Sequence, residues 1–286
     1  MLVLRGVAPM TVLVALATAC SLSAQPSPGP TGPEPAGDVE PAPPRSPHEA
    51  DDGAKNDRDE EPAPDLEPGS TTPAEILGTL SGSCGIVKTQ LTTPASTFEK
   101  NTLSFAAGET YDEASISTDG QRIMNTPNAG GSSIESEVMS FEVLRACEGA
   151  KLLKTETEVL YGDDVAGPAT ITDILVEIAG KKVGVSVTRA YRPQSQPFPD
   201  ADVKALIEKK LEGINQSTRR VKPEDKWVKQ ILHVFAANKA QADAVSRVLP
   251  TIDAAIRANT IVLLTQTSGG GFVYCNPDPP LGSECP

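Results

Sequence analysis

The sequence has little histidine and few aromatic residues. His48 and His233 are the two histidines among 286 residues, and Phe, Trp and Tyr together make up 4% of the chain. A site built from several histidines is therefore excluded, and Ser-His or Cys-His catalysis would depend on one of these two side chains. After the N-terminal segment, no apolar run is long enough to cross a membrane as a helix. The sequence also lacks a phosphate loop, a nucleophile elbow and a dinucleotide fingerprint.

Basic residues are also scarce: 25 Lys and Arg stand against 38 Asp and Glu, which gives a formal charge of −13. Most of this charge lies in residues 25–73, where twelve acidic and three basic residues give −9. The same segment holds 13 of the 26 prolines and almost no apolar side chains, so we expect a disordered, extended linker over residues 20–73. Residues 74–286 carry −5, so the total charge does not argue strongly against an anionic partner for this part.

The N-terminus has the pattern of an export signal. A single positive charge is followed by the apolar run Met10–Ala19, which is too short for a stable membrane span. The small residues before Cys20 resemble the lipobox of bacterial lipoproteins. The resemblance implies removal of residues 1–19 and acylation of Cys20, for example with diacylglyceryl and palmitate groups. Such a lipid anchor would hold the chain to a membrane of the bacterial cell envelope, facing the periplasm or the exterior. A secretory signal cut near Ala24 is the alternative.

Residues 74–286 are sufficient for one buried core and contain Cys84, Cys147, Cys275 and Cys285. An even number of cysteines in an exported chain indicates two disulfides, for which three pairings exist. We favour Cys275–Cys285, which would close a short C-terminal loop, together with Cys84–Cys147, which would tie the early segment to a helix. A zinc site is the alternative, although no Cys-x-x-Cys pair or neighbouring histidine supports it.

Local patterns predict an α/β domain. We expect residues 74–131 to be rich in β-structure and a helix to begin at Ser132, with Glu135 completing a capping box. Valine and isoleucine alternate on both sides of Ala179-Gly180-Lys181-Lys182, which predicts a hairpin in which Ala179 faces Lys182. The other expected elements are strands at 101–105, 122–124, 155–161, 230–235, 261–266 and 272–275, a helix from 200 to 214, and helical segments within 240–258.

The order helix, strand, hairpin, helix, strand, helix, strand is similar to the core of PD-(D/E)XK nuclease-like proteins. The resemblance implies a mixed β-sheet flanked by helices, a restriction-endonuclease-like core, within residues 132–286. In that superfamily a helix Glu, a strand Asp and an acidic-x-Lys pair meet around a divalent metal. Glu137 and Asp173 match the first two positions. Ser186 and Thr188 stand where the acidic residue and the lysine belong, so two metal ligands at most remain from the motif.

Arg189, Lys181 and Glu177 are the neighbours able to take over the missing roles. We therefore predict Glu137, Asp173 and Arg189 as candidate catalytic residues, with Glu137 and Asp173 as the ligands of Mg²⁺ or Mn²⁺. Each also has a structural explanation: Asp173 is able to cap a strand, and Glu137 is able to pair with Arg189 inside the fold.

Other polar and aromatic residues have structural explanations that we prefer. His233 lies on an apolar strand and is expected in the core, and Trp227 is expected to anchor packing. A basic strip along one helix is able to contact phosphates, but a solvated helix face explains it better. The strip consists of Lys204, Lys209, Lys210, Arg219 and Arg220.

Together these patterns predict a lipid-anchored bacterial protein whose domain serves binding or envelope structure. Its membrane contact is Cys20, and its soluble partner is not indicated by any motif. The alternative is a nuclease or phosphodiesterase that uses Glu137 and Asp173 with Mg²⁺ or Mn²⁺ and acts on nucleic acid. A third possibility is an effector that is carried to neighbouring cells.

Overall fold

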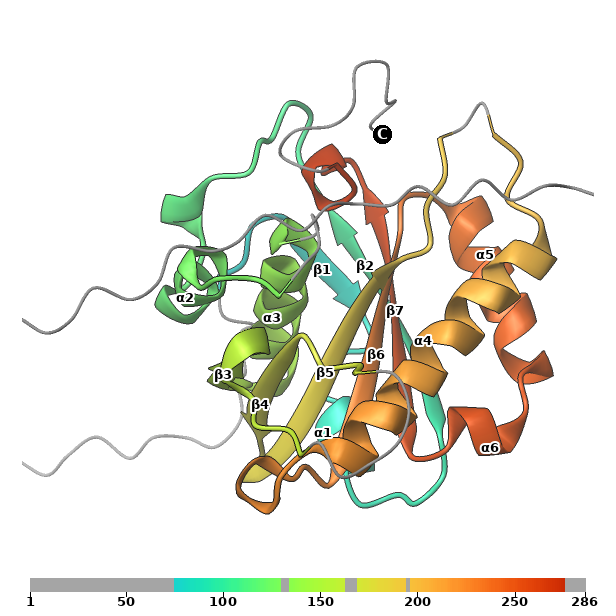
Figure 1. The fold of residues 1–286 in the computed structure, drawn as a ribbon. Helices are drawn as coiled ribbons and strands as arrows, with labels where there is room; N and C mark the ends of the chain where they lie inside the picture. The colour runs from blue at the N-terminus through green and yellow to red at the C-terminus, as the bar shows by residue number, and fades with distance from the viewer. Residues whose placement is uncertain (1–74, 130–133, 163–168, 194–195, 276–286) are drawn as a thin grey trace, which may run out of the picture. The chain divides into compact units, whose positions relative to one another are not determined.

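A seven-stranded mixed sheet forms the centre of the protein (Figure 1). The structure is a computed structural model, and it describes residues 75–129, 134–162, 169–193 and 196–275. The strand order is β1-β2-β7-β6-β5-β4-β3. The strands are β1 Thr79–Gly82, β2 Thr97–Ser104, β3 Lys151–Thr155, β4 Ile174–Ile178, β5 Lys181–Arg189, β6 Lys229–Ala236 and β7 Thr260–Ser268. Strands β2, β7, β6 and β5 are parallel, whereas β1, β4 and β3 each run antiparallel to the strand beside them.

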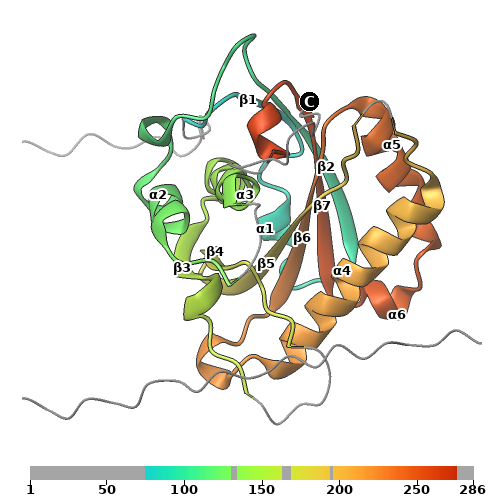
Figure 2. The same cartoon turned by 45° about the horizontal axis from the view of Figure 1, so that its top comes forward.

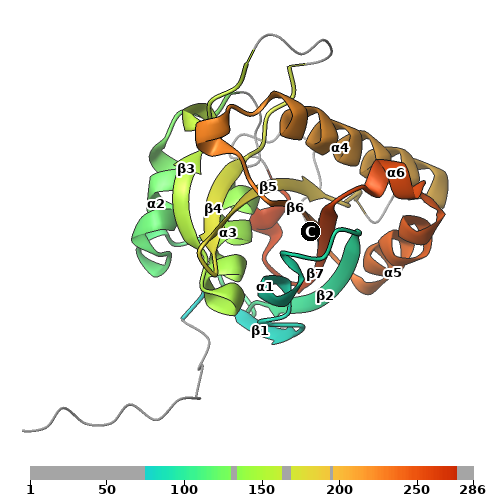
Figure 3. The same ribbon diagram turned by 90° about the horizontal axis from the view of Figure 1, so that it is seen from below.

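Helices cover both faces of this sheet (Figures 1 and 3). One face carries α1, α2 and α3, and the other carries α4, α5 and α6. The helices are α1 Val87–Gln90, α2 Thr118–Asn125, α3 Ile134–Glu148, α4 Asp200–Arg220, α5 Lys239–Val248 and α6 Ala254–Arg257. Short 3₁₀ turns span Glu113–Ser115, Glu156–Glu158, Pro223–Asp225, Leu249–Thr251 and Gly271–Val273.

The predicted fold class is confirmed. Helix α3 is followed by the antiparallel strands β3, β4 and β5, and α4 then leads to β6, which is parallel to β5. Helices α5 and α6 precede β7, which continues the parallel sheet. This is the mixed sheet flanked by helices that the nuclease-like resemblance implies. The two strands that precede α3 extend the same sheet beyond β7.

Apolar residues on both faces of the strands explain why helices cover the sheet on both sides. On β5, Val183, Val185 and Val187 are buried with residues of α3. On β6, Leu232 and Val234 pack with residues of α4 and α5, and all eight residues of the strand are buried. A strand that is buried on both faces has a nearly continuous run of apolar residues, and β6 has such a run.

Several predicted boundaries are wrong. Residues 122–124 belong to α2, because the side chain of Ser117 caps that helix by accepting a hydrogen bond from the N–H of Gly120 at 3.1 Å. The strand expected at 155–161 is instead β3, which ends at Thr155 and passes into a 3₁₀ turn. Residues 272–275 are not a strand either: Phe272 and Val273 belong to the last 3₁₀ turn.

The hairpin between β4 and β5 is confirmed, but its predicted register is wrong. Ile178 pairs with Lys181, so the loop consists of Ala179 and Gly180 alone. Their φ angles are 49° and 72°, and two positive φ values are what a tight two-residue hairpin loop requires. Leu175 therefore lies opposite Gly184 rather than opposite Ser186.

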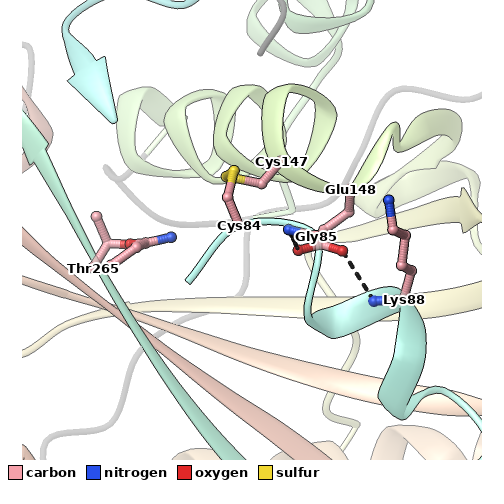
Figure 4. Close-up of a disulfide and its surroundings, with 7 residues drawn as sticks. Cys84, Gly85, Lys88, Cys147, Glu148 and Thr265 are labelled. Atoms are coloured by element: carbon pink, nitrogen blue, oxygen red, sulfur yellow. Dashed lines mark hydrogen bonds between the residues drawn. A yellow bond between two sulfur atoms is a disulfide. The ribbon is translucent and has the colours of Figure 1, made fainter. Parts of the chain in front are cut away.

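The predicted disulfide between Cys84 and Cys147 is confirmed (Figure 4). It ties the segment before α1 to the end of α3. The carboxylate of Glu148 accepts hydrogen bonds from the backbone N–H groups of Gly85 at 2.8 Å and Lys88 at 3.0 Å, which fixes the start of α1. Cys275 is also disulfide-bonded, but Cys285 lies outside the described residues, so the Cys275–Cys285 pairing stays a prediction.

The predicted signal, Cys20, the linker and Ser132 also lie outside the described residues. Across the part of the chain that is described, no helix is both long and apolar enough to cross a membrane.

Candidate functional site

The three predicted site residues come from three different elements. Glu137 lies in the first turn of α3, Asp173 immediately precedes β4, and Arg189 ends β5. Because β4 and β5 are antiparallel, the start of one and the end of the other lie at the same end of the sheet. Glu137 and Arg189 interact with each other, whereas Asp173 has a different set of partners.

Arg189 lies among two carboxylates and a tyrosine. Its Nη1 donates a hydrogen bond to the backbone oxygen of Tyr274 at 3.0 Å. Burial lowers the pKa of Arg189, and the nearby carboxylates of Glu135 and Glu137 oppose that change. Burial raises the pKa of Glu135, which its own backbone N–H and Arg189 oppose. Glu137 also accepts a hydrogen bond from Nδ2 of Asn128 at 3.4 Å, which agrees with a pairing role inside the fold.

Asp173 forms hydrogen bonds with the part of β5 that extends past the first residue of β4. Its Oδ2 accepts a hydrogen bond from the backbone N–H of Val187 at 2.5 Å, and its own N–H donates to the oxygen of Val185 at 3.0 Å. From α4, Nζ of Lys210 donates to the backbone oxygen of Val187 at 3.3 Å. Two side chains thus hold both backbone polar groups of Val187.

The unequal lengths of the two strands explain why these side chains are needed. Strand β5 has nine residues and β4 has five, and their ladder stops at the pair Ile174 and Val185. Beyond that pair, none of the described strands pairs with β5 on the β4 side, and buried backbone groups without partners are costly. Asp173 therefore has the capping role that was one of its two predicted explanations.

A second charged cluster surrounds Asp173. Burial raises the pKa of Asp173 to about 6; Lys210 and the N–H of Val187 oppose this, and the charge of Glu156 adds to it. Burial also raises the pKa of Glu156, whose carboxylate accepts a hydrogen bond from the N–H of Ala129 at 2.7 Å. Asp173, Glu156 and Lys210 thus interact with one another, as Glu135 and Glu137 do with Arg189.

The side chains at the predicted metal position do not fit Mg²⁺ or Mn²⁺ well. Ser186 and Thr188 are buried on β5, and Oγ of Ser186 lies 3.3 Å from Oγ1 of Thr172. Neither is a carboxylate, and of the two predicted ligands Glu137 interacts with Arg189, while Asp173 accepts a hydrogen bond from the N–H of Val187. Among the described residues, no group of three His, Cys, Asp or Glu side chains is placed to hold a metal ion.

The basic residues of the predicted strip on α4 have different partners. Lys204 is in an ion pair with another residue of the same helix, and Lys210 turns toward Val187. The guanidinium of Arg220 lies 5.8 Å from the centre of the Tyr161 ring. The strip is therefore not a single surface of unengaged cations.

His233 and Trp227 belong to the core, as predicted. His233 is fully buried, and its ring nitrogens lie 2.8 Å from Oγ of Ser140 and 2.7 Å from Oγ1 of Thr265. Burial lowers the pKa of His233 to about 3, so it is neutral at ordinary pH. Trp227 is buried, and its Nε1 donates a hydrogen bond to Oγ1 of Thr218 at 3.1 Å.

The sequence did not identify the partners of Asp173. The sequence pattern placed Lys210 only on a basic helix face, and it placed Glu156 in a predicted strand. Glu135 appeared only in a capping box, yet it is 9% exposed and its Oε2 has no hydrogen-bond partner among the described residues. No local pattern connects these residues, because their proximity depends on how α4 and the loop before α3 pack.

Comparisons with known proteins leave the family open. No family model matches the chain. A Dictyostelium discoideum protein named "AAC-rich mRNA clone AAC4 protein" is 40% identical over 166 residues, which cover 56% of this chain and 24% of that protein. The match thus spans about a quarter of that protein's length. The structure of Pyrococcus furiosus SfsA in complex with Ca²⁺ matches 50% of this chain and 69% of that one, at 14% identity and a TM-score of 0.26, which is too low to support an argument.

Proposed function

We propose that this chain is a lipid-anchored protein of the bacterial cell envelope whose nuclease-like domain serves binding rather than metal-dependent catalysis. The observation that argues against metal-dependent catalysis is the engagement of Asp173 with the backbone of Val187 and with Lys210. An aspartate that completes the edge of a strand is a structural group. The lipid anchor is supported by the sequence before Cys20.

The composition of the neighbouring positions favours the same conclusion. A divalent cation prefers several carboxylate oxygens that converge on one point. Here Ser186 and Thr188 supply hydroxyl groups, and Glu137 interacts with Arg189. The position that would hold a catalytic metal in the nuclease superfamily thus carries neutral side chains and an arginine-paired carboxylate.

A cleavage assay tests the absence of metal catalysis. The full chain is incubated with DNA and with RNA in the presence of Mg²⁺ or Mn²⁺, beside Asp173→Asn and the control Asp243→Asn, whose carboxylate forms an exposed ion pair with Lys239. We expect no metal-dependent cleavage by any of the three proteins. Cleavage that is lost in Asp173→Asn and kept in Asp243→Asn would refute the proposal.

Cleavage that is lost in Asp173→Asn and kept in Asp243→Asn would support the other candidate, a metal-dependent phosphodiesterase. The observation in its favour is the cluster of Asp173, Glu156 and Lys210, in which two carboxylates lie near one ammonium group. Carboxylates suit a hard cation, and a lysine is able to contact a phosphate. In that case Glu156→Gln and Lys210→Met should also reduce cleavage, whereas Glu137→Gln should have a smaller effect.

The lipid anchor needs a separate test. Mass spectrometry of the protein isolated from a bacterial membrane should find acyl chains on a mature N-terminus that begins at Cys20. Cys20→Ser should lose that mass and leave the membrane fraction. A Cys20→Ser protein that remains equally bound to the membrane would contradict the lipobox interpretation, whatever the domain binds.

A further inference from the structure

A cavity of about 640 Å³ lies beside α5, at the carboxyl ends of β5 and β6. Its wall includes Arg192 and Phe198 from the segment after β5, and Asn238, Gln241 and Arg247 from the start and body of α5. Figure 2 shows α5 beside α4, the helix that follows this segment. Its volume falls within the usual range of small-molecule sites. Ligands of open α/β sheets commonly bind outside the carboxyl ends of the strands.

Two guanidinium groups line this cavity, and each is paired with an aspartate. Arg192 donates from Nη1 to the backbone oxygen of Pro197 at 3.1 Å and pairs through Nη2 with Asp202 at 2.9 Å. Arg247 donates from Nε and Nη2 to the two carboxylate oxygens of Asp200, at 3.2 and 2.8 Å. Each guanidinium has five N–H groups, so these bonds use only part of its capacity.

The aspartate partners are exposed and therefore exchangeable. The side chains of Arg247 and Asp200 are 58% and 51% exposed. Exposed ion pairs contribute only about 0–1 kcal/mol. An incoming oxyanion is thus able to take the place of Asp200 on Arg247 at little cost, and the same holds for Asp202 on Arg192.

Hydrogen bonds fix the remaining wall. The side chain of Gln241 donates to the backbone oxygen of Arg192 at 2.9 Å and accepts from the N–H of Ala237 at 3.1 Å. Asn238 accepts from the N–H of Gln241 at 3.0 Å. The guanidinium of Arg192 lies 5.6 Å from the centre of the Phe198 ring, so a flat apolar surface adjoins a cation.

We propose that this cavity binds a small molecule in which a carboxylate or phosphate group is joined to a planar ring. Arg247 and Arg192 bind the oxyanion, and Phe198 contacts the ring. Neither Asp173 nor Cys20 takes part, so this binding site is independent of the metal question and of the lipid anchor.

Calorimetric titration of the full chain tests the proposal with four probes: phenyl phosphate, benzoate, inorganic phosphate and benzylamine. We expect saturable binding of phenyl phosphate, benzoate or both, and none of benzylamine. Stronger binding of phenyl phosphate points to a phosphate ligand, and stronger binding of benzoate points to a carboxylate. Failure of both ring-bearing anions to bind, or binding of benzylamine at equal strength, overturns the proposal. Inorganic phosphate that binds as well as phenyl phosphate overturns the role of the ring.

Variants locate the binding site. Arg247→Gln should weaken binding about tenfold or more, because it removes a charged hydrogen-bond donor. Asp200→Asn should strengthen binding, because it removes the carboxylate that competes for Arg247. Arg122→Gln, which loses an exposed ion pair with Glu158 outside the cavity, should change nothing. Unchanged affinity in Arg247→Gln, or weaker binding in Asp200→Asn, overturns the proposed location.

A measurement on the unmodified chain covers the case of a variant that fails to fold. In NMR spectra, phenyl phosphate or benzoate should shift the amide signals of Asn238 and Gln241, whereas benzylamine should not. Shifts confined to residues outside the cavity contradict the proposal.

Discussion

Replacing Asp173 by asparagine should stabilise the domain at neutral pH. Burial raises the pKa of Asp173 from 3.8 to about 6, so the folded state holds this carboxylate less favourably than water does. Each pKa unit corresponds to about 1.4 kcal/mol, so ionisation of Asp173 reduces the free energy of unfolding by up to about 3 kcal/mol. Asparagine cannot ionise, yet its Oδ1 is still able to accept the hydrogen bond from Val187. Since Asp173 is partly exposed, this value is an upper bound.

The effect has a defined sign and pH window. Below a pH of 3.8, the ordinary pKa of Asp173, both states hold the proton and ionisation costs nothing. As the pH rises toward about 6, the unfolded chain loses the proton before the folded domain does, so the wild-type protein loses stability. Above that pH the cost is constant. The stability of Asp173→Asn relative to wild type should therefore increase across this window and then level off.

Urea unfolding followed by circular dichroism, in steps from about pH 4 to about pH 8, measures this difference. Asp243→Asn is the matched control. Its ion pair with Lys239 lowers the pKa of Asp243 below its ordinary value of 3.8, so its loss should reduce stability slightly and by a nearly constant amount across this pH range. A difference between Asp173→Asn and wild type that does not change with pH, or that decreases as the pH rises, would refute the reasoning. The second outcome would mean that Lys210 favours the folded carboxylate more than burial disfavours it.

Three further predictions concern groups outside the candidate site. Lys229 is buried, and its Nζ donates to the backbone oxygens of Thr93 at 2.5 Å and Ala95 at 2.9 Å and to Oδ1 of Asn259 at 2.7 Å. Lys229→Met should therefore lower the free energy of unfolding in urea by about 2–4 kcal/mol, and a decrease below about 0.5 kcal/mol would contradict this role. Replacing both Cys84 and Cys147 by serine opens a link across 63 residues and should cost about 4 kcal/mol by loop entropy, measured in the same way; unchanged stability would show that the link constrains little. The ring protons of His233 should show no titration in NMR spectra between about pH 5 and about pH 8, because burial lowers its pKa to about 3, and a transition near its ordinary pKa would show that the ring is hydrated.

The sequence indicated the elements better than it indicated their contacts. The alternation of Val183, Val185 and Val187 predicted a strand of a hairpin, and the structure has that strand, buried on both of its faces. The hairpin register was missed because Ala179 adopts a positive φ, which is uncommon for a residue with a Cβ. The loop therefore begins one residue earlier than a glycine-centred turn would.

Long-range contacts explain why the arrangement of the site residues differs from the one that the sequence predicted. Asp173 was predicted beside Glu137 because the nuclease pattern places both at one metal. The side-chain bonds that complete the edge of β5 depend instead on the short length of β4 and on where α4 crosses the sheet. Neither fact is encoded locally around Asp173. Arg189 was correctly associated with Glu137, because both ends of that pair follow from the position of elements that the pattern predicted.

The place of β2 in the sheet sets the order in which this domain is able to fold. Strand β2 pairs in parallel with β7, and Oγ1 of Thr265 donates a hydrogen bond to Oδ1 of Asn101 across 164 residues of sequence. Strands β1 and β2 therefore have no sheet to join until β7 has been made and has paired with β6. Such distant pairings slow folding, because a long loop must close before any contact compensates for it. During synthesis, residues 79–104 are able to pair with each other but should join the rest of the sheet only after β7 has emerged, and they then complete the sheet last.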